Sequence, residues 1–437
     1  MSIASIASVR ARQVWDSRGN PTVEAEVQLE GGAMGRAIAP AGASRGSREA
    51  VDLRDGGTKL RGLGVSRAIG SIHDIIAPAL AGRDAEDQQG LDAILAALDP
   101  SPQKAMLGGN ATVAVSLAAL HAAAAARGLP LWQHVAEHYQ RRPSIPLPEI
   151  QIFGGGAHAG RRVDIQDFMV MVPGAASFAE ALEVTHEIYA AAGRLMAARG
   201  RLAGVADEGG WWPAFDSNEE ALETLTAAIR KAGEEPGERV VISLDIAASE
   251  FGRKGRYRLA LEDRSLSTAE MIELLGRWLD RYPIASIEDP LAEDDPDGLI
   301  EFTARFGGRV QIIGDDFLVT NAELVRQAVA QKATNAVLIK VNQAGTVTEA
   351  IAALSAAESA GWRGVVSARS GETEDTSISH LAVGLGAGQL KVGSFSRSER
   401  MAKWNECLRI AEHPAAGRFV AGEPLRRTWW AQKERGK

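Results

Sequence analysis

Residues 240–245 read VVISLD, residues 284–288 read IASIE, and residues 310–315 read VQIIGD. Each stretch is a short apolar run that ends in an acidic residue. Three later runs of the same kind end in basic residues, and the six charged ends are 43, 27, 25, 29 and 22 residues apart. A parallel strand, its return helix and two loops take roughly 25–30 residues. The spacing therefore predicts successive βα units of a (β/α)8 barrel, a fold of the α/β class.

The acidic ends of these runs are candidate metal ligands, because the strand ends of such a barrel converge on one mouth. Asp245, Glu288 and Asp315 offer carboxylate oxygens, which Mg²⁺ prefers. Taken singly, an acid at a strand end is more often a helix cap or a solvated loop residue. Three such carboxylates on neighbouring strands would repel one another without a cation between them, so together they favour a metal site.

The basic ends are candidate catalytic and substrate-binding residues. Lys340 follows an apolar run and can act as a base if desolvation and a nearby cation or Lys391 lower its pKa. A lysine that extends along apolar surface to solvent is the alternative. Arg369 and Ser370 offer a guanidinium fork and a hydroxyl group to a phosphate. A dication that binds a substrate carboxylate would make the neighbouring C–H proton acidic.

The bulk composition is that of a globular protein with two domains. The chain has 437 residues, of which 45% are hydrophobic and 24% are charged, and a net charge of −8 without a long basic run. A nucleic-acid partner is therefore not expected. Cys407 is the single cysteine, so no internal disulfide can form and a reducing compartment fits. The first residues lack the apolar segment of a signal peptide, and the apolar stretch 117–126 is too short to cross a bilayer. We expect a cytoplasmic protein with no membrane partner.

The chain divides best at a proline-rich segment, residues 141–148. Before it, residues 6–40 alternate apolar and polar side chains as in an antiparallel meander, and residues 57–127 have the composition of helices. We therefore predict an N-terminal α+β domain over residues 1–140 and the barrel over residues 141–437. The S/T-x-x-E spacing predicts helix starts in the barrel. The expected N-caps are Ser177, Ser217, Ser267 and Thr320.

Two glycine-rich segments are candidate active-site loops. Residues 39–50, APAGASRGSREA, contain Ser44, and residues 154–160, GGGAHAG, contain His158. On composition alone the first segment is a flexible surface loop. The functional alternative is a mobile lid that brings the serine hydroxyl to a metal or a phosphate. Glu208, in a glycine-flanked bend, is the natural acid to work opposite the base.

The sequence resembles the glycolytic enolase (phosphopyruvate hydratase) family from Arg10 to about Glu412. The matching stretches are WDSRGNPTVE, GASRGSREA, HAG, QDFMV, DEGG, SLD, SIEDPLAEDD, GDDFLVTN, LIKVNQAGT, RSGETEDT and RSER. The resemblance implies an N-terminal α+β capping domain and a modified TIM barrel whose second strand, expected over residues 163–172, runs antiparallel. It also implies a homodimer in which Glu24 of one chain pairs with Arg409 of the other.

The resemblance implies a chemistry, the removal of water from 2-phosphoglycerate to give phosphoenolpyruvate. It makes Asp245, Glu288 and Asp315 the ligands of a tightly bound Mg²⁺. Ser44 is then the loop serine that joins a second Mg²⁺, whose binding depends on the substrate. The partner is a small phosphorylated or phosphonylated hydroxy acid.

The resemblance also assigns the proton transfers. Lys340 matches the base that takes the C2 proton, and Glu208 matches the acid that helps the C3 hydroxyl group leave. Lys391 corresponds to a lysine on the substrate carboxylate. The other positions that match substrate-binding residues of the family, or lie beside them, are His158, Gln166, Asp167, Arg369 and Ser370.

The sequence departs from the family pattern around the substrate. Enolases typically read SHRSGETED, whereas Ala368 stands here in place of the histidine. Asp167 replaces a glutamate that is one methylene longer, Gly154 replaces an asparagine, and Arg45 replaces a small threonine. The metal ligands and the base are retained.

Three functions therefore remain open. The first is an ordinary glycolytic enolase. The second is a specialised paralogue that makes carboxyphosphonoenolpyruvate in phosphonate or phosphinate biosynthesis, where Ala368 and Arg45 would accommodate an added carboxylate. The third is a catalytically silent binding or structural protein. Turnover of 2-phosphoglycerate distinguishes the three.

Overall fold

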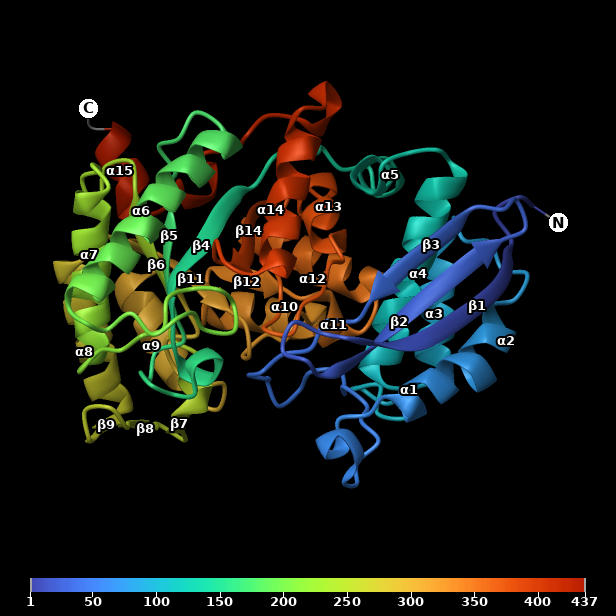
Figure 1. Cartoon of the computed structure of the whole chain (residues 1–437), viewed down its shortest axis with the longest axis horizontal. Helices are drawn as coiled ribbons and strands as arrows, with labels where there is room; N and C mark the ends of the chain where they lie inside the picture. The colour runs from blue at the N-terminus through green and yellow to red at the C-terminus, as the bar shows by residue number, and fades with distance from the viewer. Residues whose placement is uncertain (1, 436–437) are drawn as a thin grey trace.

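The chain begins with a three-stranded antiparallel sheet that packs on helices. The computed structural model describes residues 2–435. The strands are β1 (Ile6–Trp15), β2 (Pro21–Leu29) and β3 (Met34–Ile38), paired in that order. Figure 1 shows this sheet, in blue, beside the barrel rather than within it. Val23, Ala25 and Val27 are fully buried, so the predicted meander is confirmed together with the inward face of its middle strand.

The long helix α4 (Gly109–Ala126) fills the space behind this sheet. Within residues 2–435 it is the one helix that is long and apolar enough to cross a membrane, but 83% of it is buried inside the protein, as in a core helix. Its alanine-rich sequence lets β3 approach closely. The neighbouring helical segments are η1 (Lys59–Gly62), α1 (Ser66–Ser71), η2 (Ile72–Ile76), α2 (Ala77–Leu80), α3 (Gln88–Leu98) and α5 (Leu131–His138).

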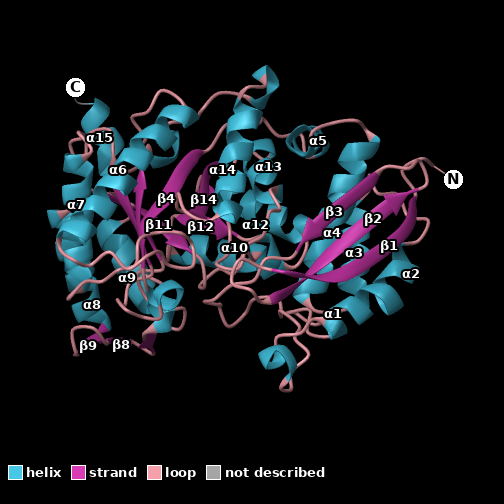
Figure 2. Ribbon diagram, viewed as in Figure 1, coloured by secondary structure: helices cyan, strands magenta, loops and turns pink. Residues whose placement is uncertain are grey.

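Eight strands then close into a barrel, which Figure 2 shows in magenta among its helices. In barrel order they are β4 (Leu147–Gly154), β5 (Asp167–Met171), β6 (Val241–Asp245), β10 (Ile284–Glu288), β11 (Gln311–Gly314), β12 (Ala336–Ile339), β13 (Arg363–Ser367) and β14 (Gly388–Gly393). β5 is antiparallel to both of its neighbours, whereas the other pairs are parallel. The modified barrel with a reversed second strand is confirmed.

Helices follow most of the barrel strands and form its outer layer. They are α6 (Phe178–Ala198), α7 (Asn218–Lys231), α8 (Thr268–Arg281), α9 (Pro296–Phe306), α10 (Ala322–Gln331), α11 (Val341–Ala344), α12 (Val347–Ser359), α13 (Ser377–Gly384), α14 (Ser398–Ala411) and α15 (Trp429–Arg435). Short helical turns are η3 (Gly156–Ala159), η4 (Ala248–Glu250), η5 (Pro414–Ala416) and η6 (Glu423–Leu425). A small sheet follows β6 before α8. Its strands are β7 (Gly252–Arg253), β8 (Arg256–Leu259) and β9 (Arg264–Ser267), and this insertion explains the longest spacing between charged strand ends.

Three of the four predicted helix caps are confirmed. The side chains of Ser177, Ser217 and Ser267 each accept a hydrogen bond from the backbone N–H three residues later, and Ser267 forms a complete capping box. The prediction for Thr320 was wrong, because Asn321 caps α10. The Thr320 hydroxyl instead binds Gln343 at the barrel mouth, where a buried polar partner outweighs a local cap.

The N-terminal part is tied to the barrel by polar contacts across their interface. Ser116 Oγ of α4 accepts a hydrogen bond from the backbone N–H of Val347 (3.0 Å) at the start of α12. The backbone groups of Ala41 and Gly371 pair with each other, which places the loop 39–50 over the barrel mouth. The exact division at residues 140 and 141 stays a prediction.

The close packing of β3 against α4 can be tested by adding a methyl group at Gly35. A Cβ atom added at Gly35 would lie 2.1 Å from the carbonyl oxygen of Ala118 and 2.2 Å from the backbone nitrogen of Ala122. We expect Gly35→Ala to lower the free energy of unfolding by about 1–3 kcal/mol or more, because neither backbone can move aside cheaply. Gly308→Ala is the control, since that position has open space and ordinary backbone geometry. Equal urea-denaturation curves for the two variants would contradict the close packing.

Candidate functional site

A small cavity at the barrel mouth gathers most of the side chains that the sequence singled out. The predicted site residues that line it are Ser44, His158, Gln166, Asp167, Glu208, Asp245, Lys340, Arg369, Ser370 and Lys391. The two remaining ones, Glu288 and Asp315, are buried directly behind the cavity and bond to its lysines. Ala368 also lines the cavity. The structure thus brings every predicted site residue to one place.

The carboxylates are adjacent because the parallel strands are in register. Asp245 is the last residue of β6, Glu288 is the last residue of β10, and the two are direct partners across the sheet. Asp315 follows the end of β11, which pairs with β10 on its other side. All three side chains are buried. The acidic residues that end successive apolar runs in the sequence therefore lie side by side at one end of the barrel.

Two lysines balance this buried negative charge. The ammonium group of Lys391 lies 2.8 Å from a carboxylate oxygen of Asp245 and 2.8 Å from one of Glu288. Lys340 donates a hydrogen bond to Asp315. Burial lowers the pKa of Lys340 and is the largest single effect, but the negative charges of Asp315 and Glu288 together leave this pKa above its ordinary value. In this arrangement both lysines are charged.

The carboxylates keep coordination capacity that no protein group uses. Asp245 Oδ1 and Glu288 Oε1 are buried, and neither has a hydrogen-bond partner among residues 2–433, whose side chains the structure describes. An unpaired buried carboxylate oxygen is costly, so these atoms fit an oxygen-preferring cation. A second close group of acidic oxygens joins Asp315 to Asp289 and Asp316. The Asp289 carboxylate accepts hydrogen bonds from the backbone N–H groups of Asp315 (2.9 Å) and Asp316 (2.8 Å), and so orients the chain after β11.

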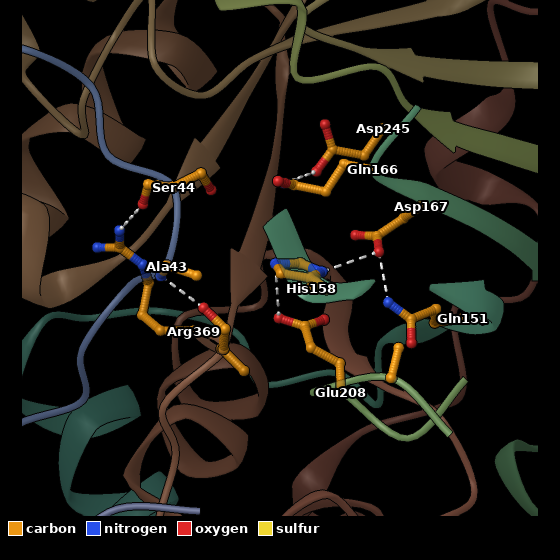
Figure 3. Close-up of polar contacts among 12 residues, drawn as sticks. Ala43, Ser44, Gln151, His158, Gln166, Asp167, Glu208, Asp245 and Arg369 are labelled. Atoms are coloured by element: carbon orange, nitrogen blue, oxygen red, sulfur yellow. Dashed lines mark hydrogen bonds and ion pairs between the residues drawn. The ribbon is translucent and has the colours of Figure 1, made fainter. Parts of the chain in front are cut away.

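His158 connects two acids on the other part of the cavity wall (Figure 3). Its Nδ1 lies 3.3 Å from Asp167 and its Nε2 lies 3.6 Å from Glu208. Burial alone would lower the pKa of His158, but Glu208 and Asp167 together raise it to about 8. Gln151 and His158 both bond to Asp167, which fixes that carboxylate although its side chain is one methylene shorter than glutamate. Glu208 is thereby placed beside a cationic ring.

Arg369 links the barrel to the loop 39–50. Figure 3 shows its guanidinium group pointing at this loop, where it donates to the carbonyl oxygen of Ser44 (3.0 Å). Ser370 Oγ accepts the backbone N–H of Ala43 (2.6 Å). The predicted phosphate-binding pair therefore also holds the loop, and Ser44 lines the cavity.

Sequence reasoning missed two residues of this network, Glu49 and Gln343. The Glu49 carboxylate accepts both terminal nitrogens of Arg369 (3.0 and 3.2 Å), and it also accepts the backbone N–H of Gly46 (3.0 Å). Gln343 donates to Glu49 (3.2 Å) and to Asp315 (2.8 Å). Both lie within stretches that match the family, but neither ends an apolar run. The one sequence signal that could have identified Glu49 and Gln343 was their position inside stretches that match the family.

Arg45 does not line the cavity. Its guanidinium group pairs with Asp52 (2.9 Å), and 45% of its side chain is exposed. The expected encounter between Arg45 and an added substrate carboxylate therefore lacks support in this conformation. Glu24 likewise pairs within the chain, with Arg12 and Arg36, while Arg409 is mostly exposed beside Glu406.

The fold and the site together define a TIM-barrel protein with an N-terminal α+β unit and an acid–lysine centre at the barrel mouth. A family model described as "Enolase, N-terminal domain" matches residues 6–135, and one described as "Enolase, C-terminal TIM barrel domain" matches residues 142–428. The chain belongs to the enolase family. It is 47% identical over 426 residues to a protein named "Enolase 1" from Desulfitobacterium hafniense (strain Y51), an alignment that covers 95% of this chain and 97% of that protein.

The role of Glu49 can be tested by removing its charge. We expect Glu49→Gln to lower the free energy of unfolding by about 3–5 kcal/mol, because it removes the carboxylate that pairs directly with the buried guanidinium group of Arg369. Glu293→Gln is the control, since Glu293 reaches the same loop through the exposed backbone N–H of Ser47 and should cost at most about 1 kcal/mol. Chemical denaturation measures both. The same loss in both variants would show that the loop, rather than the buried pair, carries the effect.

Proposed function

We propose that the protein is a Mg²⁺-dependent hydro-lyase of the phosphopyruvate hydratase type. It removes water from 2-phosphoglycerate or a close analogue to give a phosphoenolpyruvate-type enol ester. The observation that carries this proposal is that Lys340 and Glu208 line the same cavity, with buried carboxylates behind it. A base, an acid and a set of oxygen donors are the groups that this elimination needs.

We assign the metal to the three buried carboxylates at the strand ends, two of which have a free oxygen. Asp245, Glu288 and Asp315 would hold one Mg²⁺, and Ser44 would join a second one when substrate is present. The metal would supply positive charge that stabilises the enolate form of the substrate and competes with Lys340 for Asp315. The unpaired buried oxygens of Asp245 and Glu288 support this donor set.

The chain's own groups move the protons. Lys340, once uncharged, takes the proton from C2 of the substrate, and the electron pair left on carbon shifts towards the substrate carboxylate. Glu208 gives a proton to the C3 hydroxyl group, which leaves as water while the double bond forms. His158 lies beside Glu208 and Asp167 and orients both. These assignments follow general acid–base logic, in which base and acid work on adjacent carbons.

The substrate is held by the remaining polar groups of the cavity. Lys391 faces the carboxylate end, and Arg369 with Ser370 faces the phosphate. Gln166 donates to Asp245 (3.0 Å) and so keeps that ligand in place. A pocket lined by Lys340, Arg369 and Lys391 suits a compact substrate with two anionic groups.

A specialised paralogue is the second candidate, and Ala368 is the observation in its favour. This residue lines the cavity where a typical enolase has histidine, so it offers space for a bulkier analogue such as the precursor of carboxyphosphonoenolpyruvate. The position of Arg45 against Asp52 does not add to this reading. For a catalytically silent binding or structural protein we find no specific supporting observation among residues 2–435.

The metal assignment predicts a loss of activity without Mg²⁺. Chelation should abolish turnover, and Asp245→Ala should lower kcat/KM by at least about 10³-fold, because one removed ligand weakens charge stabilisation in the transition state. Turnover is measured by the absorbance of the enol ester, with Mg²⁺ added back. Asp294→Ala, an acid in the loop before α9, is the matched control. Full activity of Asp245→Ala in chelator-treated buffer would contradict the assignment.

The substitution at Ala368 predicts slow turnover of 2-phosphoglycerate. Losing one transition-state hydrogen bond typically costs about 2–4 kcal/mol, or roughly 10²–10³ in rate. We expect Ala368→His combined with Asp167→Glu to raise kcat for this substrate. A wild-type kcat inside the usual range of about 1–10³ per second would refute the specialised candidate and leave the ordinary enolase.

We also propose a cytoplasmic homodimer in which Glu24 meets Arg409 of the partner chain. Arg409 is 67% exposed at the side chain and is available for such a contact. Sedimentation at micromolar concentration should give the mass of two chains, and Arg409→Glu should shift the protein towards monomer, because it places like charges opposite each other. A wild-type monomer at that concentration would contradict the proposal.

A further inference from the structure

We propose that the protein has a second anion-binding site at the end of the barrel opposite the candidate active site, and that it takes a compact, multiply charged anion of the phosphate type. The site is formed by two adjoining cavities. They share Arg363, the first residue of β13, and Pro424 in η6. The catalytic candidates lie at the other ends of the same strands, as Lys391 does in β14 and Asp245 in β6.

Arginine residues dominate the walls of these cavities. The larger cavity measures about 480 Å³, which lies in the size range of small-molecule sites. The arginines that line one cavity or the other are Arg142, Arg363, Arg418, Arg426 and Arg427. Glu423 is the acidic residue among the lining side chains. The positive charge of the cavities therefore greatly exceeds the negative charge.

Most of this charge has no partner in the protein. Glu423 accepts Arg363 at 3.4 Å and Arg418 at 3.1 Å, which uses both carboxylate oxygens. The side chains of Arg142, Arg426 and Arg427 form no ion pair or hydrogen bond with residues 2–433, the part of the chain whose side chains the structure describes. The nearby acid Glu358 is bonded to Arg141, which lies outside the cavity lining. An anion from solution would supply the missing counter-charge.

Arg363 shows most clearly that these arginines lack hydrogen-bond acceptors and counter-charge. Its Nε atom is buried and has no hydrogen-bond partner among the described residues. Burial and the neighbouring Arg426 lower the pKa of Arg363, so the surroundings disfavour the charged form of this guanidinium group. A buried N–H donor without a partner is costly and is normally satisfied by a ligand or water. Guanidinium groups bind phosphate oxygens through pairs of parallel hydrogen bonds, which matches this donor set.

The backbone around the cavities is shaped for close approach. Gly361, in the left-handed region, lies beneath Arg427, and an added Cβ atom would be 3.0 Å from a guanidinium nitrogen. Gly386, also in the left-handed region, lies against the carbonyl oxygen of Arg142. These glycines let the arginines converge on one hollow. A second copy of this chain is disfavoured as the occupant, because a symmetric contact would set arginines against arginines.

Calorimetric titration with inorganic phosphate, on the full-length protein with Mg²⁺ at constant ionic strength, tests the proposal. We expect saturable binding that persists in Arg369→Gln, which removes a candidate contact at the barrel mouth. Arg427→Gln and Arg363→Gln should each weaken this binding about tenfold, the effect of one lost charge-assisted hydrogen bond. Arg277→Gln, which removes one exposed arginine of α8, should leave this binding unchanged.

The outcomes separate this site from the active site and from diffuse charge. Loss of all phosphate binding in Arg369→Gln would assign it to the barrel mouth and overturn the proposal. If Arg277→Gln weakened phosphate binding as much as Arg427→Gln does, the binding would reflect the overall charge of the protein and the proposal would fail. Saturable binding of nucleic acid or acidic peptide without phosphate binding would also overturn the proposal. Arg427 is exposed, so its variant tests the site even if Arg363→Gln fails to fold. Turnover by Arg427→Gln should equal wild type, whatever substrate the active site uses.

Discussion

The buried balance between three carboxylates and two lysines at the barrel mouth is the interaction on which the rest of the site depends. Asp245, Glu288 and Asp315 are out of contact with bulk water, and buried charges are tolerated only when they are paired. Lys340 and Lys391 provide that pairing in the structure. Asp245 and Glu288 each retain one buried oxygen without a hydrogen-bond partner, so the pairing is incomplete in a way that favours a cation.

This charge balance explains why the N-terminal part of the chain matters for chemistry at the barrel. The loop 39–50 enters the mouth from that part, and Glu49 brings a further negative charge onto Arg369. Gln343 then connects Glu49 to Asp315. Two hydrogen-bonded side chains, Glu49 and Gln343, thus connect the loop to a candidate metal ligand.

The sequence predicted those features that repeat along the chain or depend on strand ends. Asp245 and Glu288 were found because each ends an apolar run, and parallel register then places them side by side. The reversed strand β5 followed only from the family resemblance, because periodicity does not reveal strand direction. Glu49 escaped prediction since its partners lie about 300 residues away. Thr320 was misassigned because a contact with Gln343 outweighs the local capping signal.

The central claim is that Lys340 removes the C2 proton from a substrate that other groups hold. The most direct test is exchange of that proton with deuterium from solvent, followed by NMR on 2-phosphoglycerate with Mg²⁺ present. The account predicts exchange in the wild type, retained exchange in Glu208→Gln despite blocked dehydration, and a loss of at least about 10²-fold in Lys340→Ala. Exchange by Lys340→Ala at the wild-type rate would contradict the account, because another group would then be the base.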